Sequence, residues 1–535
     1  MIEDGVRIDV KGIVRATTIV TAIALVVKGL GFVEKILLAY FFGTGIQVDA
    51  YLVAYTIPFS AFIVLREVVE PAFLPTFVST WRASDRDGWR LFSVIGTVLL
   101  LLLGAATVAG ILLAPGLISV AAPGFSGEQA ELAVHLTRLV MPALLFLGLS
   151  TLTTAVLHAQ KRFTLPALSV ASFRAGPLIL FLAVGGVQGL ALGVVLGALG
   201  KLAVEALGLG RYLRRVRMSL DLVFPPVRTV GRLAAPLLLA LSLSLFIGPL
   251  VENAFASKIG VGGVSALAYA RKIAETLTTI LPYTLALVLL PFSAEMAARH
   301  DSQALARTLT GAVRALTLVF LPVTMGLMVL REPFVRLLFE RGAFTAASTQ
   351  LTAGPLFFYA LALLPFALEV VVIQFYFARQ DTLTPVIADI LAFALNVLPI
   401  SPLMGVFGLG GIALAVAVAK TLKVLALLVL FGRRVPAFRL ASLVPFAGQM
   451  VLASLATAAA LLAIGLAQGR LSPSLAQHGV EGQGLIGLLA YLAGAAALGG
   501  GTFFLAAYLV RVGEVRSLCQ RGLSWCRGMI QGARK

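Results

Sequence analysis

Charged side chains interrupt several long apolar runs of this 535-residue sequence. They are Lys28, Glu34, Lys35, Asp49, Arg66, Glu67 and Glu70 in the first half, and Glu252, Arg271, Lys272 and Glu275 in the second half. If these runs lie in lipid, each such charge at a helix centre costs about 2.5–3.5 kcal/mol on insertion scales. The charges are therefore expected to face one another or a shared aqueous chamber.

Two kinds of chemistry are open to the cations among them. Two pairs of opposite charges have the four-residue spacing that places both on one helix face. These pairs are Arg66 with Glu70 and Arg271 with Glu275. Lys28 and Lys272 lie outside these pairs, and two cations from matching helices suit an anion such as a phosphate or diphosphate. A structural ion pair of each lysine with a nearby carboxylate is the alternative.

Oxygen-bearing side chains in the second half suit a hard cation. Glu252, Asp389 and Asn396 carry the oxygen ligands that such cations prefer. We expect of them either a coupling site for Na⁺ or H⁺, or hydrogen bonds between helices. No other cofactor is expected, because the sequence has no Walker loop and its four histidines are scattered. No catalytic constellation is evident either, so the protein is not expected to be an enzyme.

The elements that carry these charges follow from composition and apolar runs. Hydrophobic residues make up 59% of the chain and charged residues 12%, which indicates an all-α polytopic membrane protein. About fourteen runs reach the roughly 20 residues that cross a bilayer core about 30 Å thick. They lie near residues 13–42, 49–77, 90–121, 129–157, 163–185, 188–210, 232–257, 264–294, 305–330, 346–377, 384–403, 408–431, 441–468 and 483–510. Several further charges within them are expected to snorkel toward span ends. These are Arg138, Arg174, Lys201, Glu205, Glu369, Lys420 and Lys423.

An internal repeat relates the two halves of the sequence. Pro123-Gly124-Phe125-Ser126 returns as Gly342-Ala343-Phe344-Thr345, 219 residues later. At the same offset, Ala159-Gln160-Lys161-Arg162 returns as Ala378-Arg379-Gln380-Asp381. The duplication covers most of residues 13–435. Repeated halves are typical of transporters, in which the substrate is held between the two copies near the bilayer midplane.

The repeat predicts the domain organisation. With about six spans in each copy, both copies cross the membrane in the same direction and are related by a pseudo-twofold axis along the membrane normal. We expect an N-terminal lobe at residues 1–218, a C-terminal lobe at 219–435, an extra helix pair at 436–512 and a basic tail at 513–535. The only two cysteines, Cys519 and Cys526, lie in that tail and do not form a disulfide framework.

The formal net charge of +18 follows membrane topology and does not indicate binding of nucleic acid. Lysine and arginine are concentrated in alternate connections, including residues 211–232 and 433–439. The positive-inside rule then places both termini in the cytoplasm. The basic tail is expected to lie on anionic lipid headgroups. The first apolar run is too long for a cleaved signal peptide.

Three segments resemble the signature segments of the MviN/MurJ lipid II flippases. They are Phe41-Phe42-Gly43-Thr44-Gly45 with Asp49-Ala50-Tyr51, Leu338–Thr345, and Phe377–Pro385. The resemblance covers about residues 13–510 and implies the fourteen-helix fold of the multidrug/oligosaccharidyl-lipid/polysaccharide exporter superfamily. It also implies a monomer in the bacterial cytoplasmic membrane. That monomer would move lipid II, the undecaprenyl-diphosphate-linked peptidoglycan precursor, to the outer leaflet by alternating access.

The resemblance assigns roles to residues of the central cavity, where the family carries arginines and an aspartate. Lys28 and Lys272 match two of the arginines with the charge kept, and Asp49 matches the aspartate. Glu34 departs from the pattern, because it stands where the family has arginine, with Lys35 beside it. A second departure puts an apolar residue near Phe62 in place of another arginine, with Arg66 one turn on. The substrate-binding residues expected are Lys28, Asp49, Lys272, Arg66, Lys35, Glu34 and Arg271, and the sodium or proton site expected is Glu252, Asp389 and Asn396.

Other functions remain open at this point. The lost arginines favour a different prenyl-linked oligosaccharide, such as an exopolysaccharide or O-antigen unit, because lysine is a point charge whereas arginine binds phosphate oxygens bidentately. A cation-coupled drug antiporter would need a cavity lined by acids rather than bases. A polytopic glycosyltransferase would need catalytic acids on outer loops, and the outer loops here are short.

Overall fold

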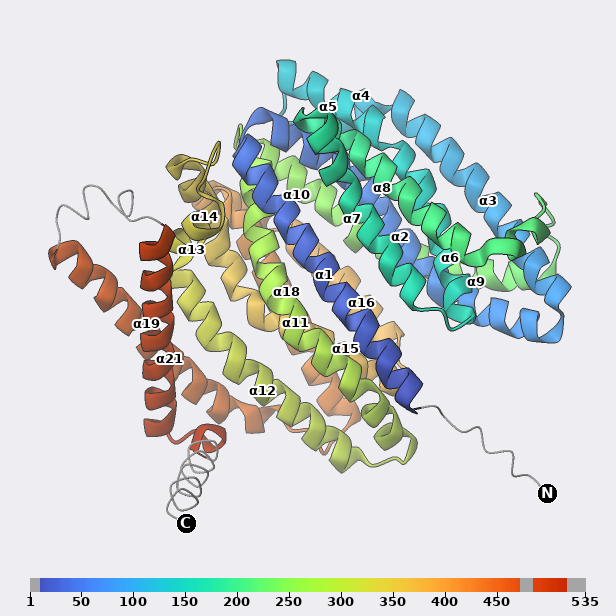
Figure 1. Ribbon diagram of the computed structural model, residues 1–535. Coiled ribbons are helices and arrows are strands. Elements are labelled where there is room, and N and C mark those ends of the chain that lie inside the picture. Colours follow the sequence, from blue (N-terminus) through green and yellow to red (C-terminus); the bar gives the residue numbers. More distant parts are fainter. Residues whose placement is uncertain (1–9, 472–484, 517–535) are drawn as a thin grey trace, which may run out of the picture. The chain divides into compact units, whose positions relative to one another are not determined.

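The computed structural model describes residues 10–471 and 485–516 of the chain (Figure 1). The chain divides into two compact units, Met1–Ser265 and Ala266–Lys535. The described residues form helices and no strand, which confirms the all-α prediction. The predicted tail beyond residue 516, with Cys519 and Cys526, lies outside the described residues.

The first unit is built from helices that follow the predicted apolar runs. They are α1 (Val10–Phe42), α2 (Ile46–Ala83), α3 (Asp85–Leu112), α4 (Ala114–Ala121), α5 (Gly127–Val140), α6 (Pro142–Ala159), α7 (Thr164–Val184), α8 (Gly186–Leu209), η1 (Gly210–Arg215), α9 (Pro225–Leu241), η2 (Ser242–Ile247) and α10 (Gly248–Ser257). The run near 232–257 changes register at η2, a π-helical turn in front of Pro249. Proline has no N–H to continue the α-helical ladder. The N–H of Gly248 instead bonds to the carbonyl of Leu243, five residues earlier.

The second unit continues from α11, which begins at the end of the first unit. Its helices are α11 (Gly263–Ala298), α12 (Ser302–Val329), α13 (Arg331–Phe339), α14 (Ala346–Leu361), α15 (Leu363–Ala378), α16 (Leu383–Val397), α17 (Ile400–Phe407), α18 (Gly410–Arg434), η3 (Leu440–Leu443), α19 (Val444–Leu471) and α21 (Leu485–Leu509). Two predicted runs are bent pairs, α14 with α15 and α16 with α17, each with a 43° bend.

The number of membrane spans agrees with the sequence. Among the described residues, 11 helices are long and apolar enough to cross a membrane, and the bent pairs raise this to 13. The remaining predicted run corresponds to α1, a helix of 33 residues. The segment predicted as the seventh span, α9 to α10, packs against α2 within the first unit. The lobe boundaries at 218 and 435 rest on the sequence repeat and stay a prediction.

The repeat extends to backbone geometry. Lys161 after α6 and Gln380 after α15 both have a left-handed φ, 60° and 59°. In each case the N–H of the next residue bonds to the carbonyl five residues earlier, at 2.9 and 3.0 Å. Both helices thus end in the same Schellman cap, at positions that the sequence repeat relates. In the second cap, burial of the Asp381 carboxyl disfavours its ionisation. The Thr384 N–H and the Arg434 guanidinium outweigh this effect and hold the pKa of Asp381 below its ordinary value of 3.8.

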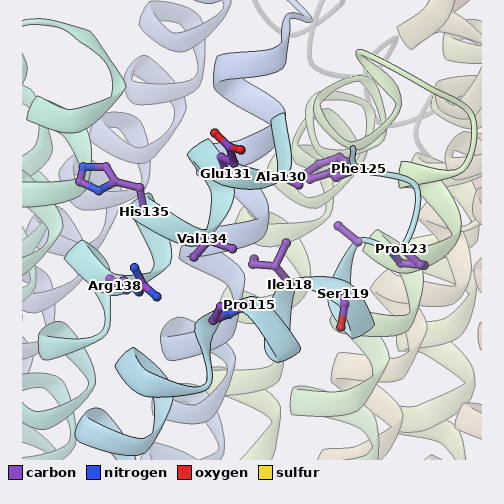
Figure 2. Close-up of a pocket in the computed structure, with 11 residues that line it drawn as sticks. Pro115, Ile118, Ser119, Pro123, Phe125, Ala130, Glu131, Val134, His135 and Arg138 are labelled. Atoms are coloured by element: carbon purple, nitrogen blue, oxygen red, sulfur yellow. The ribbon is translucent and has the colours of Figure 1, made fainter. Parts of the chain in front are cut away.

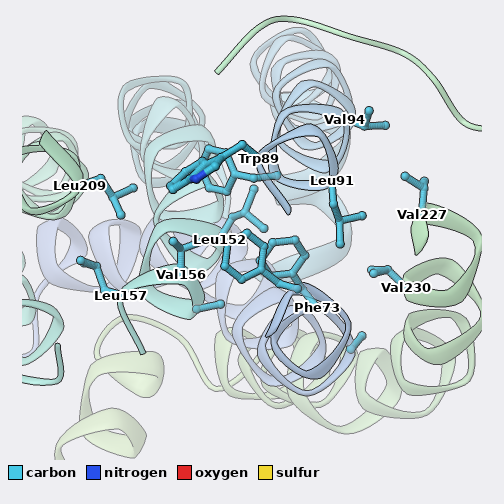
Figure 3. Close-up of a cluster of buried hydrophobic side chains, with 14 residues drawn as sticks. Phe73, Trp89, Leu91, Val94, Leu152, Val156, Leu157, Leu209, Val227 and Val230 are labelled. Atoms are coloured by element: carbon cyan, nitrogen blue, oxygen red, sulfur yellow. The ribbon is translucent and has the colours of Figure 1, made fainter. Parts of the chain in front are cut away.

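A buried aromatic and aliphatic cluster joins α2, α3, α6 and α8 of the first unit (Figure 3). Phe73 and Phe77 are fully buried in it, and Trp89 stacks on Tyr212 with ring centroids 5.3 Å apart. The basic connection after α8 is fastened beside this cluster, because Arg215 pairs with Asp85 of α3. Close packing here holds the C-terminal part of α2, the helix that carries Arg66, Glu67 and Glu70.

Candidate functional site

Charged residues of α2 do not form the pair that helical spacing predicted. The guanidinium of Arg66 binds the adjacent Glu67 at 2.7 Å, and both side chains are about half exposed. Glu70 instead contacts His158 of α6, with 2.6 Å between Oε1 and Nδ1. The prediction of an Arg66 pair with Glu70 is therefore wrong. The partner of Glu70 therefore lies on the neighbouring helix α6 and not on α2 itself.

A buried charged cluster lies where α1, α2 and α7 meet. Glu34 of α1 is buried, with 4% of its surface exposed. It accepts a hydrogen bond from Arg174 of α7 at 3.4 Å. The guanidinium carbon of Arg174 also lies 5.9 Å from the ring centroid of Phe59 on α2 and 5.6 Å from that of Phe173. These distances are within the range of cation–π attraction.

Sequence reasoning missed the importance of Arg174. The expectation that it snorkels toward a span end is wrong, because Arg174 lies near the middle of α7, about 15 Å from either helix end. Its position in the middle of the apolar run 163–185 is the sequence signal that identifies it as an arginine with partners inside the protein. A central arginine cannot reach water along its own helix and must find partners on neighbouring helices.

Glycines of α7 and α8 set the position of Arg174. A Cβ atom added at Gly176 would lie 2.4 Å from the carbonyl oxygen of Gly193, and one added at Gly197 would lie 2.4 Å from that of Phe173. The two helices therefore pack backbone against backbone, as the four-residue glycine spacing in α8 allows. This contact holds the α7 backbone on both sides of Arg174.

Asp49 caps the start of α11. Its side chain is fully buried, and its two carboxylate oxygens accept the N–H groups of Gly262 at 2.7 Å and Ser265 at 2.8 Å. The first N–H groups of a helix have no partner within the helix, so such acceptors stabilise its start. In this structure Asp49 thus holds the segment that leads into α11. Its predicted contact with substrate stays a prediction.

The predicted anion-binding cations lie on α1 and α11. Lys28 is exposed, Lys35 and Lys272 are partly buried, and none of these lysines is without an interaction partner. Arg271 donates through Nε and Nη2 to the hydroxyl of Tyr359 on α14, at 3.2 and 3.0 Å. Because Tyr359 is fully buried, it holds the Arg271 guanidinium in a fixed place.

A buried ion network joins α6, α7 and α8 in the first unit. Glu205 is fully buried and pairs with Lys201 one turn earlier. The Glu205 carboxylate also accepts the hydroxyl groups of Thr153 at 2.5 Å, Thr154 at 2.9 Å and Ser169 at 2.7 Å. The snorkelling predicted for this lysine and glutamate is wrong. The carboxylate finds four donors inside the unit.

A second buried ion network joins α15, α16 and α18 in the second unit. Glu369 accepts from Lys420 at 2.8 Å and from Lys423 at 2.5 Å, and Lys423 also pairs with Asp389. Lys423 is fully buried at its side chain, so the snorkelling predicted here is wrong as well. Lys420 follows Lys201 by the same 219 residues as the sequence repeat. Each unit therefore carries an internal ion network that includes a lysine at the repeated position.

At Asp389, one residue of the predicted cation site, a lysine of the protein already lies against the carboxylate. The carboxylate of Asp389 is neutralised by the Lys423 ammonium, and a metal cation would have to displace that group. Asn396 lies on the same helix, α16, whereas Glu252 is buried on α10 of the first unit. Within the described ranges, no group of three or more His, Cys, Asp or Glu residues could hold a metal ion.

An apolar groove of about 540 Å³ runs along the second unit. It is lined by side chains of α12, α13, α19 and α21, among them Leu318, Val323, Phe334, Gly500 and Phe503. Figure 2 shows another cavity, also about 540 Å³, between α4 and α5 of the first unit. Its lining includes Ser119, Glu131, His135 and Arg138. Sequence patterns predicted neither cavity, because each combines residues from separate helices.

The fold and the charged helices define a class of protein, a polytopic membrane transporter with an internally repeated helical chain. A model of the family described as lipid II flippase MurJ matches residues 38–478. The chain belongs to this family.

Relatives agree with this assignment, and solved structures have a similar fold. The probable lipid II flippase MurJ of Bdellovibrio bacteriovorus is 27% identical over 84% of this chain and 88% of its own length. The probable lipid II flippase MurJ of Rhizobium meliloti is 30% identical over 74% of this chain and 76% of its own length. The fold is similar to that of a lipid II flippase MurJ in an inward closed conformation, with a TM-score of 0.75, 20% identity, and coverage of 92% of this chain and 98% of that one. It is also similar to an inward-facing multidrug resistance MATE family transporter of the MOP superfamily, with a TM-score of 0.65, 16% identity, and coverage of 76% and 94%.

Proposed function

We propose that this protein is a flippase that moves lipid II from the cytoplasmic to the outer leaflet of a bacterial membrane. The observation that carries the proposal is the match of residues 38–478 to the lipid II flippase family, which includes most of both units. Both termini are placed in the cytoplasm by the distribution of basic residues. The protein acts as a monomer and breaks no covalent bond.

Cations of α1 and α11 hold the diphosphate of the substrate. Lys28 and Lys35 belong to α1 of the first unit, and Arg271 and Lys272 to α11 in the second. Opposite charges attract more strongly in a medium of low dielectric than in water, so a few such cations are enough to hold a diphosphate at membrane depth.

The family pattern predicts an arginine on α1 at the position of Glu34. Arg174 of α7 supplies a guanidinium there instead. Glu34 replaces an arginine of that pattern, and it pairs with Arg174 of α7 at 3.4 Å. A guanidinium therefore lies beside this position although its own residue is acidic. Its planar fork suits phosphate oxygens in a way that the neighbouring Lys35 does not.

The prenyl chain of the substrate is proposed to lie along the apolar groove of the second unit. The groove is lined mostly by leucine, valine, phenylalanine, alanine and glycine. Such a lining gives a polyisoprenoid dispersion contacts and offers few polar groups that its binding would desolvate. The headgroup and the tail then have separate binding surfaces, which allows the headgroup to cross while the tail stays in contact with lipid.

Alternating access is the proposed mechanism of transport. Each unit has its own internal ion network, around Glu205 and around Glu369. Breaking a buried pair by removing one partner costs about 3–5 kcal/mol, so these networks favour movement of each unit as a body. Because Lys423 already neutralises Asp389, we do not propose a sodium ion at that carboxylate.

Complementation tests the proposed substrate. The gene is expressed in bacteria depleted of their own lipid II flippase, and growth is measured beside an empty vector. Growth with normal cell shape is the expected result. The rival substrate, another prenyl-linked oligosaccharide, is favoured by the departure at Glu34. It predicts no growth in this strain but restored surface polysaccharide in a strain that lacks its O-antigen flippase.

A further inference from the structure

A basic cavity of about 800 Å³ lies beside α12 in the second unit, and its lining contains none of the charged residues assigned to transport above. Arg307 and Arg314 line it from α12, and Arg439 lines it from the connection that follows α18. Among the described residues, Glu514 is the one acidic residue of its lining. Three guanidinium groups and one carboxylate give the cavity a positive net charge, which suits an anion.

Arg314 is the most deeply placed of these cations. Its Nη1 donates to Glu514 at 2.9 Å, and its guanidinium carbon lies 5.2 Å from the ring centroid of Phe446. Its Nε is buried and has no hydrogen-bond partner within the described part of the chain. A buried donor without a hydrogen-bond partner is unfavourable. An acceptor oxygen brought by a ligand would remove that cost.

The shape of the surroundings indicates an amphipathic ligand. Leu318 lines both the basic cavity and the apolar groove of the second unit. The basic cavity therefore borders the apolar groove, whose lining suits hydrocarbon chains. The connection after α18 and the start of α12 are helix ends, where the polar headgroups of a bilayer lie. Basic pockets among helix ends are known binding places for anionic lipid headgroups.

We propose that this cavity binds the phosphate of an anionic glycerophospholipid, with Arg314 and Arg439 as its main contacts and the acyl chains leaving the cavity at Leu318. Arginine presents several donors in a planar fork that matches phosphate oxygens. Glu514 occupies one of these donors while the site is empty of lipid. The carboxylate thus acts as an internal competitor that the phosphate displaces. The proposal does not depend on the transported substrate.

Equilibrium binding of fluorescent phosphatidylglycerol to the purified full-length protein in zwitterionic detergent tests the site. Arg314→Gln and Arg439→Gln each remove a charged hydrogen-bond partner and are expected to weaken binding about tenfold or more. Glu514→Gln removes the competing charge and is expected to tighten binding several-fold. A variant that merely unfolds the protein does not produce tighter binding, so this third variant separates the proposal from a folding defect.

Two controls complete the experiment. Arg433 is exposed, lies in the last turn of α18 and does not line the cavity. Lipid binding by Arg433→Gln should therefore stay within about twofold of wild type. Inorganic phosphate alone should bind far more weakly than the lipid. Equal losses in Arg314→Gln and Arg433→Gln would overturn the site. Competition by inorganic phosphate at the same concentration as the lipid would overturn the lipid as its ligand.

Discussion

At the scale of single residues, the central observation is that two carboxylates of the apolar helices pair with residues on other helices. Glu34 meets Arg174, and Glu70 meets His158. Helical spacing alone indicated Arg66 as the partner of Glu70. A charge removed from water gains most from the nearest opposite charge in a low-dielectric surrounding, and tertiary packing decides which group that is.

Arg174 is expected to be needed for transport rather than for folding alone. Arg174→Gln removes the cation next to Glu34, and lipid II transport should fall about tenfold or more, because charged hydrogen bonds contribute about 1.5–3 kcal/mol. Arg174→Lys should keep part of the activity, since the charge stays while the fork is lost. Transport in proteoliposomes is the measurement.

The matched control is Arg138→Gln, which removes an exposed arginine of α5 in the same unit. Arg138 donates to the backbone carbonyl of Ile111 at 3.3 Å. Its loss should leave transport unchanged. Full transport by a well-folded Arg174→Gln protein would contradict the role given to this arginine.

At the scale of helices, the contact between α7 and α8 determines where the buried cluster sits. The backbones of the two helices touch at Gly176, Gly193 and Gly197. No side chain separates them, so a small change in one helix shifts the other. Arg174 lies between the contact points of α7 and moves with that helix.

Gly193→Ala is expected to separate the two helices. The added Cβ would lie 2.4 Å from the Cα of Pro177, and overpacking of this kind costs about 1–3 kcal/mol. The melting temperature should fall, and transport should fall with it. Gly104→Ala in α3 is the control, because nothing lies within 4 Å of its added Cβ. Equal melting temperatures for the two variants would refute the close contact.

Most of the helices, but few of their contacts, can be predicted from sequence. Apolar runs locate the spans because an apolar length of about 20 residues is a local property. The caps at Lys161 and Gln380 could not be predicted locally, because neither position carries the glycine that usually marks such a cap, although the repeat relates the two positions. The networks around Glu205 and Glu369 could not be predicted, because their donors come from helices distant in the chain. Asp49 was singled out by its charge, but its role as a cap depends on a segment more than 200 residues away.

At the scale of the whole molecule, two units of similar construction carry different surfaces. Both end a helix in the same cap and hold a buried network with a lysine at the repeated position. The apolar groove belongs to the second unit, and two of the helices that line it, α19 and α21, lie outside the repeat. The additional helices thus supply a surface that duplication alone does not provide.

Filling the groove is expected to impair handling of the prenyl chain. Gly500 lines the groove, and a Cβ added there meets nothing within 4 Å. Gly500→Leu should therefore fold normally and weaken the affinity for long-chain lipid II several-fold. Gly494→Leu in the same helix is the matched control, because its position is equally open but lies outside the groove. If the affinity for a short-chain analogue falls by the same factor, the groove does not bind the tail.

Lipid II flipping in proteoliposomes tests most directly whether the cations of α1 and α11 hold the diphosphate of the substrate. The variants are Lys28→Ala from α1 and Lys272→Ala from α11, with Lys258→Ala, an exposed lysine beside Phe255, as the control. The account predicts that either of the first two abolishes flipping in folded protein while the control flips as wild type does. Unimpaired flipping by both Lys28→Ala and Lys272→Ala would contradict it.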